Sequence, residues 1–355
     1  MQLLAFCWID GAHLKVTAAR NHRAAGVLPR LLAAATVVWL AAARAIAAEP
    51  QLPPLPKSVA SPQDNPITAA KVELGKQLFF DKRLSGDNTL SCASCHQPER
   101  AFADGLARSP GAGGKQLARN TPTVLNAALF KKLFWDGRAS SLEEQALQPI
   151  QSPDEMNQDL DELERELAAV PGYRKQFQEV FGTGVTRQGI AQALAAFQRT
   201  LLSGPSPVDR YLAGDQSALS PQARRGLELF MGDAGCIRCH HGPLLSDGKF
   251  YRVGPTFDDR GLATITGKQD DVYKFRTPSL RNVAETGPYM HDGSLATLTD
   301  VVTYYYRGIP FTAPGGHALD VAPLLERSFD EIPDLVTFLK ALSGEVPKIE
   351  PPTLP

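Results

Sequence analysis

The chain has 355 residues, with 37 Lys and Arg against 38 Asp and Glu, and a formal net charge of −1. Hydrophobic residues make up 43% and charged residues 21%, which is ordinary for a globular protein, and the length suits two domains. The even charge balance excludes the strongly basic surface that a nucleic-acid-binding domain needs, so no nucleic acid partner is expected.

Residues 1–48 predict a cleavable signal peptide. Basic side chains between residues 20 and 30 precede an apolar run at 31–43, and small residues follow at 45–48. The run is too short to span a bilayer comfortably, and an uncleaved membrane anchor is the alternative. We expect export to the periplasm with cleavage near Ala47 or Ala48; the long basic segment leaves open a true start downstream of Met1. Removing residues 1–47 takes away five basic residues and one acid, which leaves a net charge of −5.

The rest of the chain shows helical periodicity and no convincing alternating strand pattern longer than a few residues. Six prolines between residues 49 and 66 predict an extended lead-in, and an apolar stripe from about Ile67 to Phe79 predicts the first helix. Further helices are predicted near residues 159–167, 190–201 and 334–342. The expected fold class is all-α with long loops.

Two pentapeptides carry the clearest chemical signal, Cys92-Ala93-Ser94-Cys95-His96 and Cys236-Ile237-Arg238-Cys239-His240. Cys-x-x-Cys-His is the attachment signature of c-type haem, in which both thiols bond to the haem and the histidine becomes the proximal iron ligand. The alternatives are a thioredoxin-type pair or a zinc site, but a histidine directly after the second cysteine, twice over, does not fit them. Two covalently bound haem c groups are predicted, which also fits export, because bacteria attach haem covalently outside the cytoplasm.

Each haem motif follows a similar helical segment. Gly75–Phe79 and Gly226–Phe230 share a glycine, a leucine and a phenylalanine at matching positions, and look like one unit used twice. We therefore predict two cytochrome c-like haem domains, residues 49–205 and 206–355. Each is expected to be a small helical shell in which the haem replaces much of the hydrophobic core.

Three longer stretches make the chain resemble the bacterial di-haem cytochrome c peroxidase family, including its MauG-like branch. They are Arg119-Asn120-Thr121-Pro122-Thr123 with Phe134-Trp135-Asp136-Gly137-Arg138, then residues 142–156, and Thr277-Pro278-Ser279-Leu280-Arg281-Asn282 leading to Pro288-Tyr289-Met290-His291-Asp292-Gly293. The resemblance covers nearly all of residues 65–345. It implies a peroxidatic N-terminal haem with an open iron position and a fully ligated C-terminal haem that relays electrons.

The resemblance also implies roles for particular residues. Glu155 corresponds to the acid/base that moves a proton during cleavage of the peroxide O–O bond, and Gln145 to a polar group that orients the peroxide. Trp135 lies between the haems in the family pattern. Without the resemblance, Glu155 would be taken for an ordinary surface carboxylate and Trp135 for a core aromatic.

A calcium ion is implied as well. Asn120, Thr286 and Pro288 match the family positions that bind calcium between the domains, where proline can contribute only its carbonyl oxygen. Without the resemblance, nothing in the sequence marks these three residues as calcium ligands.

Two departures concern the iron ligands. No histidine occurs between Gln97 and Cys239, so the peroxidatic haem is expected to lack a removable distal histidine and to need no reductive activation. Tyr305 stands fourteen residues after His291, where many relatives carry methionine, which matches the tyrosinate-ligated MauG-like branch. Tyrosinate favours ferric iron and lowers the reduction potential. Met290 or a histidine remains the competing ligand, and Tyr305 as plain helix packing is the structural alternative.

The expected function is a periplasmic peroxidase that reduces hydrogen peroxide with electrons from a small donor such as a cytochrome c or cupredoxin. One alternative is a MauG-like, peroxide-driven oxidase that modifies a protein or another substrate. A non-enzymatic alternative is a di-haem electron carrier or redox sensor, but such a protein has no need of Glu155. Because relatives often dimerise, a homodimer is the expected assembly.

Overall fold

The computed structural model describes residues 51–307, 312–320 and 327–355, and the predicted signal peptide lies outside them. Residues 49–355 form one compact unit. The all-α prediction is confirmed, because helices dominate and the strands are two residues long each. Within the described residues, no helix has both the length and the apolar character that a membrane span requires.

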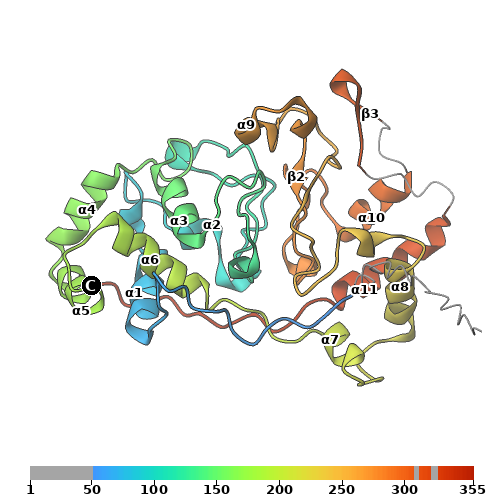
Figure 1. Ribbon diagram of the computed structural model, residues 1–355, viewed down its shortest axis with the longest axis horizontal. Helices are drawn as coiled ribbons and strands as arrows, with labels where there is room; N and C mark the ends of the chain where they lie inside the picture. The colour runs from blue at the N-terminus through green and yellow to red at the C-terminus, as the bar shows by residue number, and fades with distance from the viewer. Residues whose placement is uncertain (1–50, 308–311, 321–326) are drawn as a thin grey trace, which may run out of the picture. The chain divides into compact units, whose positions relative to one another are not determined.

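Six helices build the N-terminal half. They are α1 (Ala69–Phe80), α2 (Cys92–Cys95), α3 (Leu142–Gln151), α4 (Leu160–Ala169), α5 (Pro171–Phe181) and α6 (Arg187–Gln198). Thr68 starts α1 by accepting a hydrogen bond from the Lys71 N–H with its side chain. Helices α1, α3 and α6 lie together (Figure 1) and contribute to one apolar core that includes Phe79, Ile150 and Phe197.

In the described part of the C-terminal half there are five α-helices and two small antiparallel pairs of strands. The helices are α7 (Pro207–Leu212), α8 (Pro221–Met231), α9 (Ala263–Thr266), α10 (Leu298–Arg307) and α11 (Ile332–Lys340). Strand β1 (Phe250–Tyr251) pairs with β2 (Phe275–Arg276), and β3 (Thr312–Ala313) pairs with β4 (His317–Ala318). A second core lies between α8, α10 and α11 and includes Phe230, Tyr306 and Phe338.

The two segments that look like a repeated unit make the same contact. A Cβ on Gly75 of α1 would lie 1.9 Å from the carbonyl oxygen of Ala193 on α6, and one on Gly226 of α8 would lie 2.1 Å from that of Asp334 on α11. Four residues further along each helix pair, the rings of Phe79 and Phe197 are 5.2 Å apart and those of Phe230 and Phe338 are 4.9 Å apart. Each half therefore places its haem motif after a helix that crosses a second helix at a glycine.

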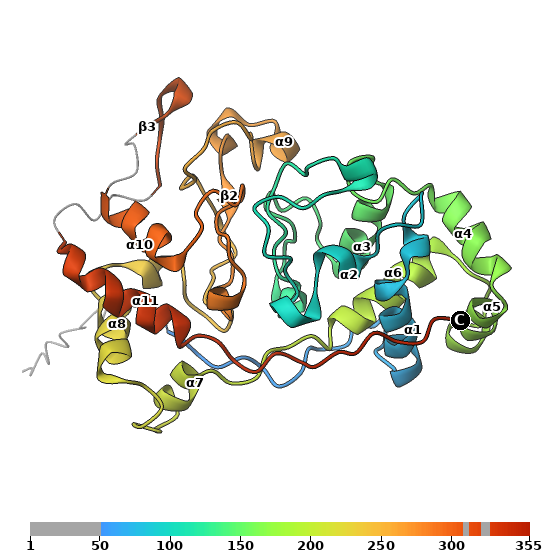
Figure 2. The ribbon, with the colours of Figure 1, turned by 180° about the vertical axis from the view of Figure 1, so that it is seen from behind.

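Each terminal segment packs against the half that lies farther from it along the chain. Leu52 in the lead-in is buried in the C-terminal core, whereas Val346 and Ile349 near the C-terminus pack against the N-terminal core. Figure 2 shows both segments running along the same side of residues 51–355, between α1 and α11. The proposed boundary between residues 205 and 206 stays a prediction, and each half includes a piece of chain from beyond it.

Candidate functional site: two haem-attachment segments and the residues between them

The first haem-attachment segment is the single turn α2 with the residue that follows it. The four described cysteines form no disulfide and are half-buried. The backbone N–H of His96 donates to the carbonyl of Cys92 over 2.9 Å, which closes the turn. The imidazole Nδ1 of His96 lies 3.2 Å from the carbonyl oxygen of Phe102. With Nδ1–H as donor there, Nε2 is the nitrogen left to bind a metal.

The second segment repeats this arrangement. The His240 N–H donates to the carbonyl of Cys236 over 2.9 Å, and Nδ1 of His240 lies 2.9 Å from the carbonyl oxygen of Leu245. Burial lowers the pKa of both His96 and His240, which favours the neutral ring that ligates iron. Two thiols beside an oriented, neutral imidazole fit covalently attached haem at both places.

A zinc site does not fit. Within residues 51–307, 312–320 and 327–355, no group of three or more His, Cys, Asp and Glu side chains is arranged to hold a metal ion directly. Burial raises the pKa of both Cys92 and Cys236 to about 12.

Glu155 lies in the turn that follows α3, and the structure brings it near the first haem motif. Its Oε2 is buried and has no hydrogen-bond partner among the described residues. Burial raises the pKa of Glu155, and the nearby Arg138 guanidinium partly opposes this. Burial and then the carboxylates of Asp104 and Glu155 raise the pKa of Cys95 to about 11, so Glu155 lies within electrostatic range of this haem-attachment cysteine.

Gln145 lies half-buried on α3, one helical turn before Gln148. Residues three apart share a helix face, so Gln145 and Gln148 are neighbours. The Gln148 side chain accepts a hydrogen bond from Nε of Arg138 over 3.0 Å, and Arg138 also pairs with Asp136 over 3.0 Å. Helix α3 and the Trp135 loop are thereby joined next to Glu155. The sequence reasoning assigned no role to Gln148 or Arg138.

Trp135 lies where the two halves of the molecule meet in the hydrogen-bond network. Its indole Nε1–H donates to the carbonyl oxygen of Asn120 over 2.9 Å, and its own carbonyl accepts from the backbone N–H of Arg276 over 2.8 Å. Arg119 reinforces this junction, because its guanidinium binds Asp136 over 2.6 Å and both carboxylate oxygens of Asp259 over 2.6 and 3.0 Å. No sequence pattern signalled the Arg119–Asp259 pair, whose members are 140 residues apart.

The three residues expected to bind calcium occupy adjoining loops. Asn120 is buried and donates its side-chain amide to the carbonyl of Leu106 over 2.9 Å, which leaves the amide oxygen available as a ligand. Pro288, after a cis peptide bond with Gly287, lines an open pocket of about 740 Å³ together with Gly105. Their oxygens are of the kind that calcium prefers.

Tyr305 differs from its neighbours on α10. The hydroxyl of Tyr304 donates to the carbonyl of Val253 over 3.2 Å and that of Tyr306 to Glu331 over 2.8 Å, whereas no partner for the Tyr305 hydroxyl is found in the part of the chain that the structure describes. Burial, then Tyr304, then Cys236 and Cys239 raise the pKa of Tyr305. Tyr305 is thus within electrostatic reach of both cysteines of the second haem motif.

The competing ligands lie in different surroundings. The ring of His291 stacks on Phe275 with 3.8 Å between centroids, and its buried Nε2 has no partner among the described residues. His317 pairs with Gln269 over 3.1 Å, and Nδ1 of His241 lies 3.1 Å from the carbonyl oxygen of Ile237. Met290 is half-buried with a positive φ of 72° and stays an alternative to Tyr305.

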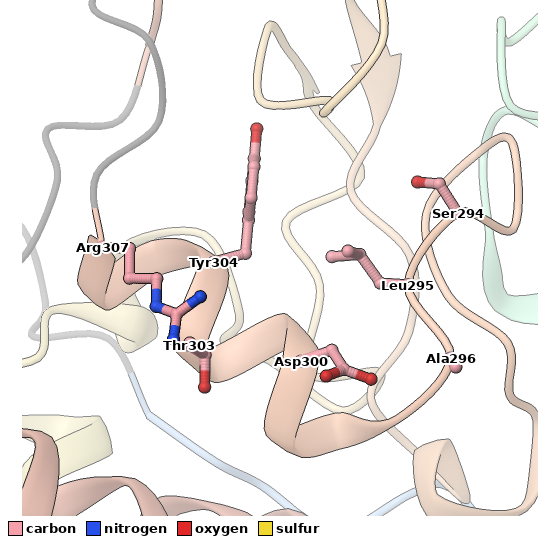
Figure 3. A pocket seen from close by; sticks show the side chains of 7 residues that line it. All are labelled: Ser294, Leu295, Ala296, Asp300, Thr303, Tyr304 and Arg307. Atoms are coloured by element: carbon pink, nitrogen blue, oxygen red, sulfur yellow. The ribbon is translucent and has the colours of Figure 1, made fainter.

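A small hollow beside α10 does not include Tyr305. Figure 3 shows its lining, which comes from α10 and from the loop before it. It measures about 420 Å³ and is lined by Ser294, Leu295, Ala296, Asp300, Thr303, Tyr304 and Arg307. The helical residues are spaced three and four apart and share one face of α10, so Tyr305 projects from a different face.

Comparison with known proteins gives consistent matches. Residues 69–217 match the family described as di-haem cytochrome c peroxidase. The chain is 44% identical to the methylamine utilization protein MauG of Methylorubrum extorquens over 84% of this chain and 86% of that one. It is 43% identical to cytochrome-c peroxidase IdrP1 of Denitromonas iodatirespirans, with 91% and 95% covered. A solved MauG-like protein associated with microbial copper homeostasis aligns with a TM-score of 0.72 and 36% identity, over 82% of this chain and 95% of that one.

Proposed function

The chain belongs to the di-haem cytochrome c peroxidase family and carries two c-type haems, and we propose that it reduces hydrogen peroxide in the periplasm with electrons from a cytochrome c or cupredoxin. An oxidoreductase that acts on peroxide and takes electrons from a redox protein follows from the family. The compartment, the kind of donor and the residue roles below are the proposal. A homodimer remains the expected assembly.

The observation that carries the proposed chemistry is the unpaired, buried carboxylate oxygen of Glu155. When bound on Cys92 and Cys95 and on Cys236 and Cys239, the two haems would together supply the two electrons that reduce one peroxide to two waters, and the donor protein would replace them. Glu155 accepts a proton at Oε2 from one peroxide oxygen and returns it to the other. Burial raises the pKa of Glu155, which favours a group that can hold a proton as well as accept one.

Two neighbours support Glu155 in this role. Arg138 holds the Trp135 loop against α3 through Asp136 and Gln148, and its charge limits the rise in the pKa of Glu155. Gln145, on the same helix, orients peroxide through its amide.

Trp135 serves as the contact through which electrons pass between the halves. This role is supported by its hydrogen bonds, one to the carbonyl of Asn120 and one from the N–H of Arg276 on β2. Asn120, Thr286 and Pro288 are proposed to hold a calcium ion that stabilises the loops around this contact. The free amide oxygen of Asn120 supports that assignment.

Tyr305 is the proposed distal ligand of the second haem. The supporting observations are that its hydroxyl has no partner among the described residues and that it lies within electrostatic range of Cys236 and Cys239. A bound ferric iron would offset the burial that raises the pKa of the phenol, because a nearby cation favours the phenolate. The same feature favours a second candidate function, a MauG-like oxidase acting on a protein or another substrate, because an anionic ligand stabilises oxidised iron.

Replacing Glu155 by Gln tests the proposal. The variant should keep both haems, and its reaction with hydrogen peroxide, followed by stopped-flow absorbance, should slow by about 10²- to 10⁴-fold. Glu179→Gln, which changes an exposed carboxylate on α5, is the matched control and should react like the parent. An unchanged rate in Glu155→Gln would remove the proposed role. Steady-state oxidation of reduced cytochrome c by the parent separates a peroxidase from an oxidase of other substrates.

A further inference from the structure

Arg276 is a buried arginine held by carbonyl groups at the junction between the halves. Only 7% of the residue is exposed. Its Nε donates to the carbonyl of Phe134 over 3.2 Å and its Nη1 to that of Thr277 over 3.2 Å. The guanidinium carbon lies 3.7 Å from the centroid of the Phe130 ring. Nη2 has no partner in the part of the chain that the structure describes.

The charge of Arg276 has no counter-ion among the described residues. Three other buried or half-buried arginines there have one: Arg119 pairs with Asp136 and Asp259, Arg199 with Glu143, and Arg281 with Asp209. Burial lowers the pKa of Arg276 to about 10, and no carboxylate opposes the shift. Leaving a buried cation unpaired is strongly destabilising, because the desolvation of its charge is not offset by an opposite charge.

Arg252 shows that burial without a carboxylate is not by itself a sign of a missing anion. Its residue is 5% exposed, but Nε, Nη1 and Nη2 donate to the carbonyls of Val272, Ala318 and Asp270 over 2.8, 2.6 and 2.8 Å. All three nitrogens are therefore used within the fold. Arg276 differs because Nη2 is left over, with two N–H groups suited to a carboxylate.

The surroundings of Arg276 lie close to the second haem-attachment segment. The carbonyl of Thr277, which accepts from Nη1, also accepts from the hydroxyl of Ser246 over 2.7 Å. Ser246 follows Leu245, whose carbonyl orients His240 of the second haem motif. On the other side, the backbone N–H of Arg276 binds Trp135. An anion bound to Nη2 would thus lie near a bound haem.

We propose that Arg276 binds a propionate carboxylate of one of the two haems through Nη2. The propionates are the negative groups that this chain acquires when the haems are attached, and a guanidinium matches a carboxylate better than any other side chain. Either haem can be the source. The inference rests on the presence of the haems and is independent of peroxide reactivity, so it can fail while the proposed function stands.

Spectroelectrochemical titration of the two-haem protein tests the proposal with Arg276→Gln, Arg276→Lys and, as matched control, Arg252→Gln. Loss of the positive charge beside a propionate disfavours the reduced haem, so Arg276→Gln should lower the midpoint potential of one haem and leave the other unchanged. The spectrum of the affected haem identifies the source. Arg276→Lys keeps the positive charge, so its midpoint potential should be close to that of the parent protein. Arg252→Gln should change neither potential. Unchanged potentials in Arg276→Gln with both haems present would overturn the proposal.

A second measurement needs no variant that loses a buried arginine. Resonance Raman spectra of the parent protein, excited in the absorption band of each haem, report the bending mode of its propionates. A carboxylate bound by a guanidinium should give a band displaced in one haem relative to the other, and Arg276→Lys should move that band. The inference would be contradicted if the propionate bands of the two haems had the same position, or if Arg276→Lys left the displaced band where it is. This test holds even if Arg276→Gln does not fold.

Discussion

Trp135 donates its indole N–H to the carbonyl oxygen of Asn120 over 2.9 Å, and the N–H of Asn120 donates to the carbonyl oxygen of His291 over 2.8 Å. One residue of the N-terminal half, Asn120, thus joins the only tryptophan in the described residues to the His291-Asp292-Gly293 segment of the C-terminal half. This path consists of one covalent segment and two short hydrogen bonds.

Trp135→Phe should slow electron transfer between the haems. Phenylalanine fills much of the same space but cannot donate to Asn120, so the hydrogen-bonded path is broken. We expect at least about a tenfold loss of steady-state turnover with reduced cytochrome c, equivalent to roughly 1.4 kcal/mol of barrier. The first reaction with peroxide should stay near the parent rate, because Glu155 is untouched. A variant that turns over like the parent would show that electrons bypass Trp135.

The rate of reaction with peroxide should depend on pH through Glu155. The base must be ionised to take a proton, so the rate should fall as the pH drops through the raised pKa of Glu155, and this fall should begin above the range of an ordinary glutamate. Because Arg138 lowers this pKa, Arg138→Gln should move the profile to still higher pH. Stopped-flow rates measured from acidic to neutral pH check both; a profile that Arg138→Gln leaves in place would argue against Glu155 as the base.

Tyr305→Met should change the second haem and leave the first alone. Replacing an anionic oxygen donor by a soft thioether raises the reduction potential of the ligated iron. Electron paramagnetic resonance of the ferric protein should show a changed low-spin signal beside an unchanged high-spin one. Tyr304→Phe is the control, because Tyr304 loses only its hydrogen bond to Val253. If Tyr305→Met leaves the low-spin signal as it is, Met290 or a histidine becomes the better candidate for the ligand.

Gly75→Ala and Gly226→Ala should each destabilise one half of the molecule. The added Cβ would lie 1.9 or 2.1 Å from a backbone carbonyl oxygen of the facing helix, so the helices must move apart. Overpacking of this kind costs about 1–3 kcal/mol, measurable as a lower midpoint of denaturant unfolding. Gly184→Ala is the control, because nothing lies within 4 Å of its Cβ position. Equal midpoints for Gly75→Ala and Gly184→Ala would mean that the crossing is more adaptable than the structure indicates.

Local patterns were sufficient to predict much of the fold. The apolar spacing in residues 190–201 and 334–342 predicted helices that the structure has at Arg187–Gln198 and Ile332–Lys340. The repeat of the Gly75 and Gly226 segments could be recognised in the sequence because a close helix crossing requires glycine at the equivalent position in both halves. The haem motifs were visible because bonding to haem requires two thiols and an imidazole within five consecutive residues.

Resemblance to a known family was needed for the distal residues. Glu155, Gln145 and Tyr305 have no local pattern that separates them from ordinary helical or surface residues, because their function depends on which other segment they face. The structure adds that Glu155 lies near Cys95 and that, within the described parts of the chain, neither Oε2 of Glu155 nor the Tyr305 hydroxyl has a hydrogen-bond partner.

The sequence by itself determined the helical class, the two haem motifs and the repeated design of the halves. Only the tertiary structure decided how the halves meet: the Arg119–Asp259 pair, the Trp135–Asn120 hydrogen bond and the single unpaired nitrogen of Arg276. The physical reason is the range of the interactions. Helix spacing and covalent motifs act over a few residues, whereas an ion pair or a missing counter-ion depends on segments about 140 positions apart, whose contact leaves no periodic trace in the chain.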